Sequence, residues 1–419
     1  MTTSRERVLM ALNHQQPDRV PLDMGATSVT GIAASSLHRL RQALGLPRRT
    51  VTVHEPFQML GFVEDDVLDA LGVDVIGLWD DGTLFGYPKR DWQPFTLNDG
   101  TPVLVPGLFN TAIEANGDIY QYPQGDRTVP PSGRMPKGGF YFDAIERQEP
   151  YDPEHLDPEE WTRDMYRLYT DDELRLFEER SKALYEGTSR AIIGNFGQGS
   201  FGDIALVPGL HIKHPKGIRA VADWYMATAL YPDYILGIYE RQCEIALKNL
   251  EMYHQAVGER IVAVFVSGTD FGSQRSAFIS PRAYRRLYKP YHERLNRWIH
   301  EHTTWKTFYH SCGSMIQLYD DFVEAGVDIV NPVQISAEGM APATLKQRWG
   351  DKLTFWGGGV DTQRVLPFGA PDEIREHVAE NIATFGQGGG FIFNAVHNIQ
   401  GGIPTENLIA LFKALADYR

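Results

Sequence analysis

Apolar, β-prone runs alternate along this chain with amphipathic segments of helical period, and this alternation limits the folds it can adopt. Eight such runs occur, and most are followed by a segment whose apolar residues have helical spacing. They cover residues 19–25, 73–80, 191–197, 261–270, 306–313, 327–334, 353–360 and 390–398. The runs are continuously apolar, as expected for strands buried on both faces of a parallel sheet. The pattern predicts an α/β chain with residues 1–419 as a single (β/α)8 TIM barrel domain.

A doubly wound open sheet is the main alternative to the barrel. That fold often binds a dinucleotide through a G-x-G-x-x-G turn after its first strand. No such turn follows residues 19–25, which weakens the dinucleotide-binding alternative.

Residues 81–151 interrupt the alternation. They contain two hairpin signals, Asp99-Gly100 and Asn116-Gly117, each between β-prone flanks. A stretch rich in proline and glycine follows. We therefore expect an antiparallel β-hairpin insertion and a lid after the second barrel strand, on the face where the strands end.

Charge and composition exclude several classes of partner. The chain carries 40 basic and 54 acidic side chains, a net charge of −14, which is the wrong sign for binding nucleic acid. Its first residues do not resemble a signal peptide, and no apolar stretch is long enough to span a membrane. Two cysteines argue against a disulfide framework. We expect a cytoplasmic protein.

Polar side chains that can bind metals, exchange protons or form directed hydrogen bonds stand at the end of almost every run. They are Asp23, Asp80, Asp81, Asn195, Gln198, Asp270, Gln274, His310, Cys312, Asn331, Gln334, Asp361, Gln363, His397, Asn398 and Gln400. Strand ends face solvent and are often polar, but solvation alone favours lysine and glutamate. Active sites of (β/α)8 barrels lie at the carboxyl ends of the strands, so this pattern predicts a functional site there.

His310 and Cys312 are the strongest candidates for metal ligands. Residues i and i+2 of a strand point to the same face, so both side chains can enter the barrel mouth. Imidazole and thiolate are preferred zinc ligands, and three protein ligands with one open position are typical of catalytic zinc. His397 is the best third ligand, with Asp361 as the fallback or as a carboxylate that orients a ligand histidine. The alternative is a hydrogen-bonded core histidine beside a small buried thiol.

Asp270 and Gln274 form a second group of candidates, in "SGTDFGSQ". Asp270 ends a strand and can act as a general base or bind a polar substrate, and Gln274 can donate or accept a hydrogen bond. The alternative role for Asp270 is to cap the following turn.

The segments "RERVLMALNHQQPDRVPL", "GTDFGSQRSAFISPRAYRRLYKPYHERL", "YHSCGSMIQLYDDFVEAGVDIVNPVQ", "FWGGGVDTQRVLPFG" and "FNAVHNIQGGIPTENL" resemble the uroporphyrinogen decarboxylase superfamily. The likeness is to its branch of corrinoid-linked zinc methyltransferases. It implies a (β/α)8 barrel with the site at its mouth. True porphyrinogen decarboxylases carry an Arg-Gln-Ala-Gly-Arg segment for substrate carboxylates. The corresponding residues here read "DMGATSVTG", which argues against tetrapyrrole decarboxylation.

The resemblance implies methyl transfer between a small molecule and a corrinoid. His310 and Cys312 look like the family's His-x-Cys zinc pair. The family's later cysteine is missing, and His397 occupies a similar location. No D-x-H-x-x-G cobalamin motif occurs, so a corrinoid must come on a separate protein.

In this view Asp270, Gln274 and Asp361 are the catalytic residues that act on the substrate, and Asn331 and Gln334 bind the cofactor. Family members commonly form homodimers, although the sequence shows no clear interface. A metal-assisted lyase, decarboxylase or hydrolase that acts on a small polar molecule without corrinoid is the second hypothesis. A non-catalytic protein that binds a ligand or a corrinoid partner is the third.

Overall fold

Seven parallel strands form one curled sheet in the computed structural model, which describes residues 2–419. Their order in the sheet is β15-β14-β13-β12-β11-β10-β3, so each strand lies beside its neighbour in the sequence. The strands are β3 (Val75–Leu78), β10 (Ala191–Asn195), β11 (Ala263–Ser267), β12 (Lys306–His310), β13 (Ile329–Asn331), β14 (Thr354–Trp356) and β15 (Phe391–Ile392).

The first predicted strand closes the sheet into a barrel, although it forms only an isolated bridge. Leu22 pairs in parallel with Phe393, just beyond β15. The Asp23 N–H donates to Phe393 O over 2.9 Å, and on the other side the Asp74 N–H donates to Leu22 O over 2.8 Å. Pro21 has no N–H to give, which limits the length of this ladder. The predicted (β/α)8 architecture is confirmed.

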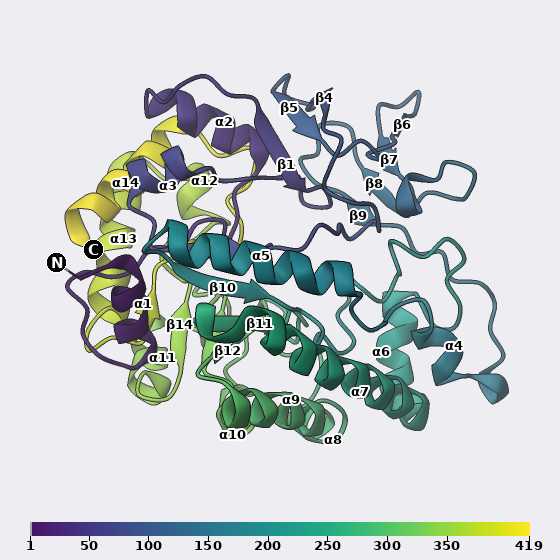
Figure 1. Cartoon of the computed structure of the whole chain (residues 1–419). Helices are drawn as coiled ribbons and strands as arrows, with labels where there is room; N and C mark the ends of the chain where they lie inside the picture. The colour runs from purple at the N-terminus through teal and green to yellow at the C-terminus, as the bar shows by residue number, and fades with distance from the viewer. Residues whose placement is uncertain (1) are drawn as a thin grey trace.

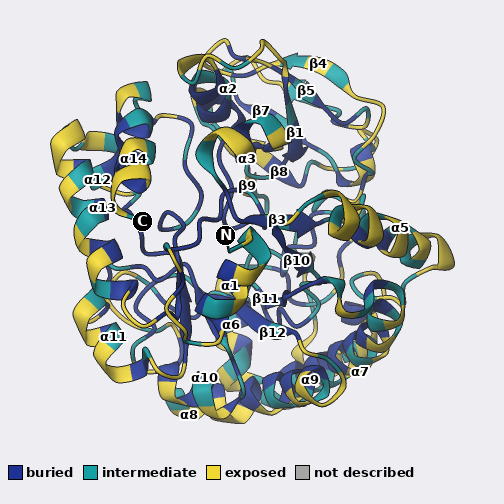
Figure 2. Ribbon diagram, turned by 60° about the vertical axis from the view of Figure 1, so that its left-hand side comes forward, coloured by how far each residue is buried: buried dark blue, intermediate teal, exposed yellow. Residues whose placement is uncertain are grey.

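Helices surround the sheet (Figure 1) and turn apolar faces inward, so that Figure 2 shows them buried inside and exposed outside. They are α1 (Ser4–Leu12), α2 (Ala34–Ala43), α3 (Asp65–Leu71), α4 (Pro158–Thr162), α5 (Asp171–Gly187), α6 (Val221–Leu230), α7 (Pro232–Val257), α8 (Pro281–Leu287), α9 (Lys289–His302), α10 (Tyr319–Glu324), α11 (Pro342–Trp349), α12 (Val365–Phe368), α13 (Pro371–Phe385) and α14 (Thr405–Tyr418). Within residues 2–419, no helix has the length and apolar character needed to cross a bilayer.

One buried cluster fills the barrel interior and fixes which side chains point inward. Each of the seven strands contributes to it, through Val75, Ala191, Ile193, Ala263, Phe308, Ile329, Trp356 and Ile392. Helix α1 adds Val8, Ala11 and Leu12 to the same cluster. Because side chains alternate along a strand, the residue two positions after an interior residue also faces the barrel axis, one layer closer to the mouth.

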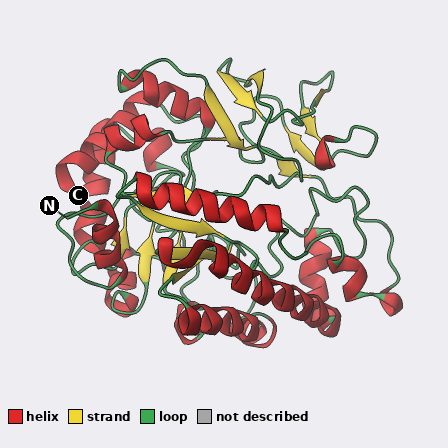
Figure 3. Ribbon diagram, viewed as in Figure 1, coloured by secondary structure: helices red, strands yellow, loops and turns green. Residues whose placement is uncertain are grey.

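The segment after β3 forms small sheets beside the barrel, drawn as a separate group of strands in Figure 3. An antiparallel sheet contains β6 (Ala112–Ile113), β7 (Ile119–Gln121), β8 (Gly133–Met135) and β9 (Asp143–Ala144). A mixed sheet contains β4 (Gln93–Thr96) and β5 (Pro102–Val105) together with β1 (Val51–Glu55) and β2 (Leu60–Gly61).

The predicted antiparallel insertion is therefore only part of the arrangement. Strands β1 and β2 precede β3 in the chain, and β1 pairs with β5 in parallel. A parallel partner about 50 residues away leaves no hairpin turn in the sequence to reveal it. The boundaries of a single domain at 1–419 with an insertion at 81–151 remain a prediction.

Asp74 ties the closing segment to the start of β3. Its side chain is fully buried and accepts hydrogen bonds from Ser4 Oγ (2.7 Å), Arg7 Nη1 (2.7 Å) and the Leu22 N–H (3.0 Å). One carboxylate thus joins α1, the closing segment and the first strand of the sheet. Removing its charge leaves the Arg7 guanidinium, which is 5% exposed, without its buried partner.

We expect Asp74→Asn to lower the free energy of unfolding by about 3 kcal/mol, because breaking a buried ion pair strands the remaining charge. Asp18→Asn is the matched control, since Asp18 also pairs with Arg7 but is 46% exposed. Its loss should cost below about 1 kcal/mol. Denaturant unfolding followed by circular dichroism measures both, and equal effects would show that Asp74 does not hold the barrel closed.

Candidate metal centre at the barrel mouth

His310 and Cys312 follow Phe308, an interior residue of β12, at intervals of two. His310 is the last residue of the strand and is 4% exposed, and Cys312 lies just beyond it in the first turn. The strand alternation that buries Phe308 therefore aims the imidazole at the barrel axis, as the sequence predicts.

Two glycines let the turn after β12 approach the turn after β11. A methyl group at Gly313 would lie 2.3 Å from the carbonyl carbon of Gly272, and one at Gly272 would lie 2.6 Å from Cys312 O. Gly313 also has a φ of 86°, which favours glycine. The two backbones pack without side chains between them, and this brings Cys312 beside Asp270.

His397 reaches the same place from beyond β15. Its φ of 67° is unusual for a residue with a side chain and turns its ring toward the barrel axis. Asn398 anchors this turn, because its side chain accepts from the Gly31 N–H and donates to Ser28 O and Gln58 Oε1. Three contacts to distant segments thus fix the neighbour of His397.

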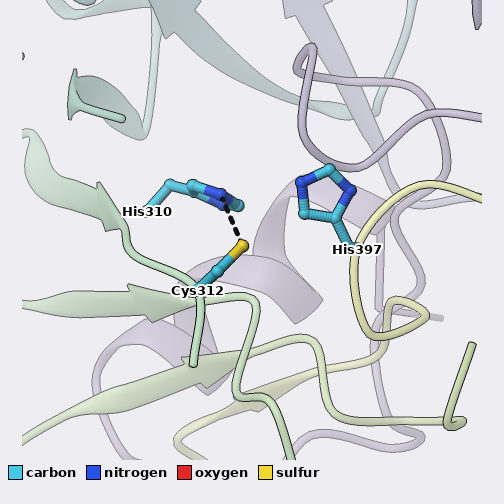
Figure 4. A group of neighbouring side chains, drawn as sticks. All are labelled: His310, Cys312 and His397. Carbon is cyan, nitrogen blue, oxygen red and sulfur yellow. Dashed lines mark hydrogen bonds between the residues drawn. The ribbon is translucent and has the colours of Figure 1, made fainter. Parts of the chain in front are cut away.

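The three predicted metal ligands come together. His310, Cys312 and His397 each offer a ligand atom, and these atoms lie within 4.8 Å of one another (Figure 4). Cys312 Sγ is 3.4 Å from His310 Nε2, and the two imidazole rings are 5.2 Å apart between centroids. Tetrahedral zinc with bonds of about 2.0–2.3 Å holds its ligand atoms about 3.3–3.8 Å apart. The His310–Cys312 pair already has this spacing, so the donor set and its geometry fit zinc.

Asn331 sets the tautomer of His310. The two residues are partners in the ladder between β12 and β13. Asn331 Oδ1 accepts from His310 Nδ1 over 2.6 Å, while Asn331 Nδ2 donates to Trp356 O over 2.7 Å. The second bond fixes which way the amide faces, so Nδ1 of His310 carries the proton and Nε2 presents its lone pair beside Cys312.

Burial controls the protonation of all three groups. It lowers the pKa of His310 to about 4, against the opposing effect of Asn331, and lowers that of His397 to about 4 with the help of His310. Both rings are neutral at pH 7, as metal ligands must be. Burial and the Asp270 carboxylate raise the pKa of Cys312 well above its usual range. The thiol keeps its proton until a cation replaces it.

The hydrogen bonding of His397 is less favourable for metal binding than that of His310. Its Nδ1 accepts from the Asn398 N–H over 2.8 Å, so the neutral ring carries its proton on Nε2. For a neutral His397 to bind a metal through Nε2, its proton must move from Nε2 to Nδ1. Nδ1 can then no longer accept the hydrogen bond from the Asn398 N–H.

Asp270 stands beside the pair on β12. Its Oδ1 accepts from the Cys312 N–H over 2.6 Å and lies 3.7 Å from His310 Nε2. Burial raises the pKa of Asp270, against the opposing effects of the Cys312 N–H and His397.

The other predicted site residues hold the surrounding turns. Gln334 Oε1 accepts from the Gly313 N–H over 2.7 Å and supports the turn that carries Cys312. Gln274 Nε2 donates to Gln363 Oε1 over 2.8 Å, at the surface. Asp361 Oδ1 accepts from the Gln363 N–H over 2.7 Å, and the structure does not bring this carboxylate into the group of three.

Asp203 is a buried carboxylate that the sequence analysis did not single out. It lies in the loop after β10, 9% exposed, and its Oδ1 accepts from the Ala205 N–H over 2.9 Å. A methyl group at Gly268 would lie 3.2 Å from its other oxygen. Burial and the charge of Asp270 raise the pKa of Asp203 to about 8. Asp203 is thus a neutral acid at pH 7 beside an ionisable partner, a pairing typical of acid–base sites. The one sequence signal is the glycine-rich "GQGSFGD" after a strand end.

Comparison with known proteins supports this architecture. The family model described as uroporphyrinogen decarboxylase (URO-D) matches residues 238–418. Uroporphyrinogen decarboxylase of Saccharophagus degradans is 31% identical over 101 residues, and that of Psychromonas ingrahamii is 37% identical over 65 residues. These alignments cover 24% and 16% of this chain, and only 27% and 18% of the two relatives.

A methyltransferase from Methanosarcina mazei has a similar fold along the whole chain. Its TM-score is 0.55 at 16% identity, covering 100% of this chain and 99% of that one. The family match includes β11 to β15 and therefore His310, Cys312 and His397. The C-terminal part of the chain, residues 238–418, is thus similar to the URO-D family, and the likeness in fold to the methyltransferase extends over the whole chain.

Proposed function

We propose that this protein is a zinc-dependent methyltransferase that moves a methyl group between a small molecule or thiol and a corrinoid carried by a separate protein. The observation that supports it most is the His-Cys-His group at the barrel mouth, in which His310 is buried and Cys312 and His397 are partly exposed. The fold match to a methyltransferase agrees with this reaction class. Zinc, when bound, supplies a Lewis acid that lowers the pKa of a substrate thiol or polarises an oxygen that carries the methyl group.

The chain's own residues prepare this site for zinc. His310 presents Nε2 because Asn331 holds the proton on Nδ1, and Gln334 holds the turn that carries Cys312. Three protein ligands leave a fourth tetrahedral position for a substrate atom. Cys312 and His397 are both partly exposed, which leaves this position accessible from the mouth.

Asp203 and Asp270 supply proton chemistry beside the three ligands. Demethylation of an ether would break the bond between its methyl carbon and its oxygen, with the corrinoid of the separate protein as the methyl acceptor. The oxygen keeps the old electron pair and needs a proton. Neutral Asp203 can donate it at pH 7, because its pKa of about 8 keeps the acid form in excess.

A decarboxylase or lyase acting without corrinoid is the second candidate. Asp203 also favours this reaction, since the carbanion left by loss of carbon dioxide needs the same kind of proton donor. The curated relatives are uroporphyrinogen decarboxylases, over short alignments. The segment Asp23–Gly31 has no arginine for substrate carboxylates, and this makes methyl transfer the better-supported proposal.

Methyl transfer can be tested with free methylcobalamin and mercaptoethanol. The zinc-loaded protein should accelerate loss of the methylcobalamin absorbance and form the methyl thioether, and His310→Ala should reduce the rate to background. Reduced cobalamin with an aryl methyl ether tests the other direction. Absence of transfer in both assays, with metal-dependent release of carbon dioxide from small carboxylic acids in the absence of corrinoid, would support the second candidate instead.

Asn331→Ala should weaken zinc affinity by about 10–100-fold, because it frees the tautomer and orientation of His310. The matched control is Asn296→Ala, which removes another buried asparagine, bonded to Ala325 O and Tyr309 Oη. Competition with a chromophoric chelator measures affinity. Equal affinity in the two variants would show that Asn331 does not prepare His310 for a metal.

Asp203→Asn should lower kcat by about 100-fold or more while zinc content stays unchanged, because the amide keeps the shape but cannot donate the proton. In the unaltered protein the rate should fall as pH rises above about 8, where Asp203 loses its proton. Rate–pH profiles with an ether substrate check both. If the variant keeps the rate of the unaltered protein and the same fall in rate at alkaline pH, Asp203 is not the acid.

A further inference from the structure

A cavity of about 440 Å³ lies outside the barrel wall, between β3, helix α5 and strand β1. Figure 1 shows α5 in front of β10 and below β1. The volume is in the range of small-molecule sites. The cavity shares no lining residue with the metal centre, and the barrel strand β3 separates the two.

Alternation along two strands builds the walls. On β1, Thr52 and His54 line the cavity while Val51 and Val53 enter the core. On β3, Val75 belongs to the barrel interior, so Ile76 faces outward into the cavity. Helix α5 supplies Arg180, Ala183 and Leu184, which share one helix face because of their spacing of three and four.

Aromatic rings gather around this cavity. Phe62 and Trp92 line it and are 42% and 38% exposed, although side chains of their size are usually more buried. Trp79 forms a third ring, in edge-on contact with His54 at 4.7 Å between centroids. Exposed rings facing one hollow provide flat apolar surfaces that a planar ligand can cover.

His54 provides a polar group without a partner. It is 6% exposed, and within residues 2–419 it contacts Phe62 and Trp79 through ring faces and edges, while no residue hydrogen-bonds to its nitrogens. Burial and the nearby Lys89 lower its pKa to about 3, so the ring is neutral and offers one donor and one acceptor. Since no protein group among the described residues bonds to these nitrogens, a ligand in the cavity can form a hydrogen bond with the ring.

The charged residues of the rim neutralise one another. Lys89 Nζ lies 3.2 Å from Asp80 Oδ1 and over the Trp79 ring, and Arg180 Nη2 lies 2.5 Å from Asp81 Oδ1. Among the lining residues that the structure describes, both cations are therefore paired, and neither is free to bind an anionic ligand. Lys89 also occupies the position over Trp79 that a ligand cation would take.

We propose that this cavity binds an uncharged, planar heteroaromatic small molecule, in contact with the rings of Phe62, Trp92 and Trp79 and hydrogen-bonded to His54. This site is independent of the methyl-transfer proposal, since none of its residues belongs to the metal centre. The ligand has at least one ring N–H or carbonyl group, because His54 discriminates against a purely hydrocarbon ring.

The test uses carbostyril, a planar bicyclic lactam with one donor and one acceptor, and the full-length protein. Isothermal titration calorimetry should show saturable binding with a Kd below about 1 mM, and no saturation with the flexible aliphatic lactam caprolactam. Ala183→Trp places a large ring at the exposed mouth and should weaken carbostyril binding by at least about tenfold. Glu178→Trp, at an exposed position of α5 outside the cavity lining, should leave it unchanged.

His54→Phe keeps an aromatic ring but removes the hydrogen-bonding group, and should weaken binding about tenfold. Thermal unfolding of each variant verifies that it is folded. The proposal is overturned if carbostyril fails to saturate the unaltered protein, or if Ala183→Trp and His54→Phe both bind it as the unaltered protein does.

Discussion

The metal site proposed at the barrel mouth depends on the hydrogen bond from His310 Nδ1 to Asn331 Oδ1. It joins neighbouring strands at paired positions of the ladder, so the register of β12 and β13 creates it. Because Asn331 also donates to Trp356 O, its amide cannot reverse without losing both bonds. The buried His310 imidazole thus presents the lone pair of its Nε2 to the site. Cys312 and His397 can complete a metal site only because this lone pair points toward them.

The barrel brings distant segments together at its mouth, and a separate cavity lies on its outer wall. At the mouth, the predicted metal ligands His310, Cys312 and His397 are accompanied by Asp203, a neutral acid whose pKa is raised by the charge of Asp270. Outside, β3 and α5 form a hollow with aromatic walls around His54. The barrel strand β3 separates the two regions, so a ligand in the outer cavity contacts none of the three predicted metal ligands.

The sequence predicts much of this structure because its strongest signals are local. Continuous apolar runs identify the strands, the i, i+2 spacing turns His310 and Cys312 to one face, and His397 ends the last run. Non-local features escape such reasoning. Strand β1 pairs in parallel with β5, and Asp203 lies in a loop whose path depends on packing against Gly268. The role of Asn331 and Gln334 at a cofactor stays a prediction. Their contacts to His310 and to the Gly313 N–H depend on how the strands and turns pack, which the sequence alone does not reveal.

The central claim is that His310, Cys312 and His397 bind one zinc ion together. Elemental analysis of metal in the purified protein, after zinc loading and removal of excess metal by gel filtration, tests it most directly. We predict about one zinc per chain in the unaltered protein and in Cys243→Ala, and loss of most of it in His310→Ala, Cys312→Ser and His397→Ala, each folded by circular dichroism. A protein without zinc after loading, or three variants that keep it, would contradict the account.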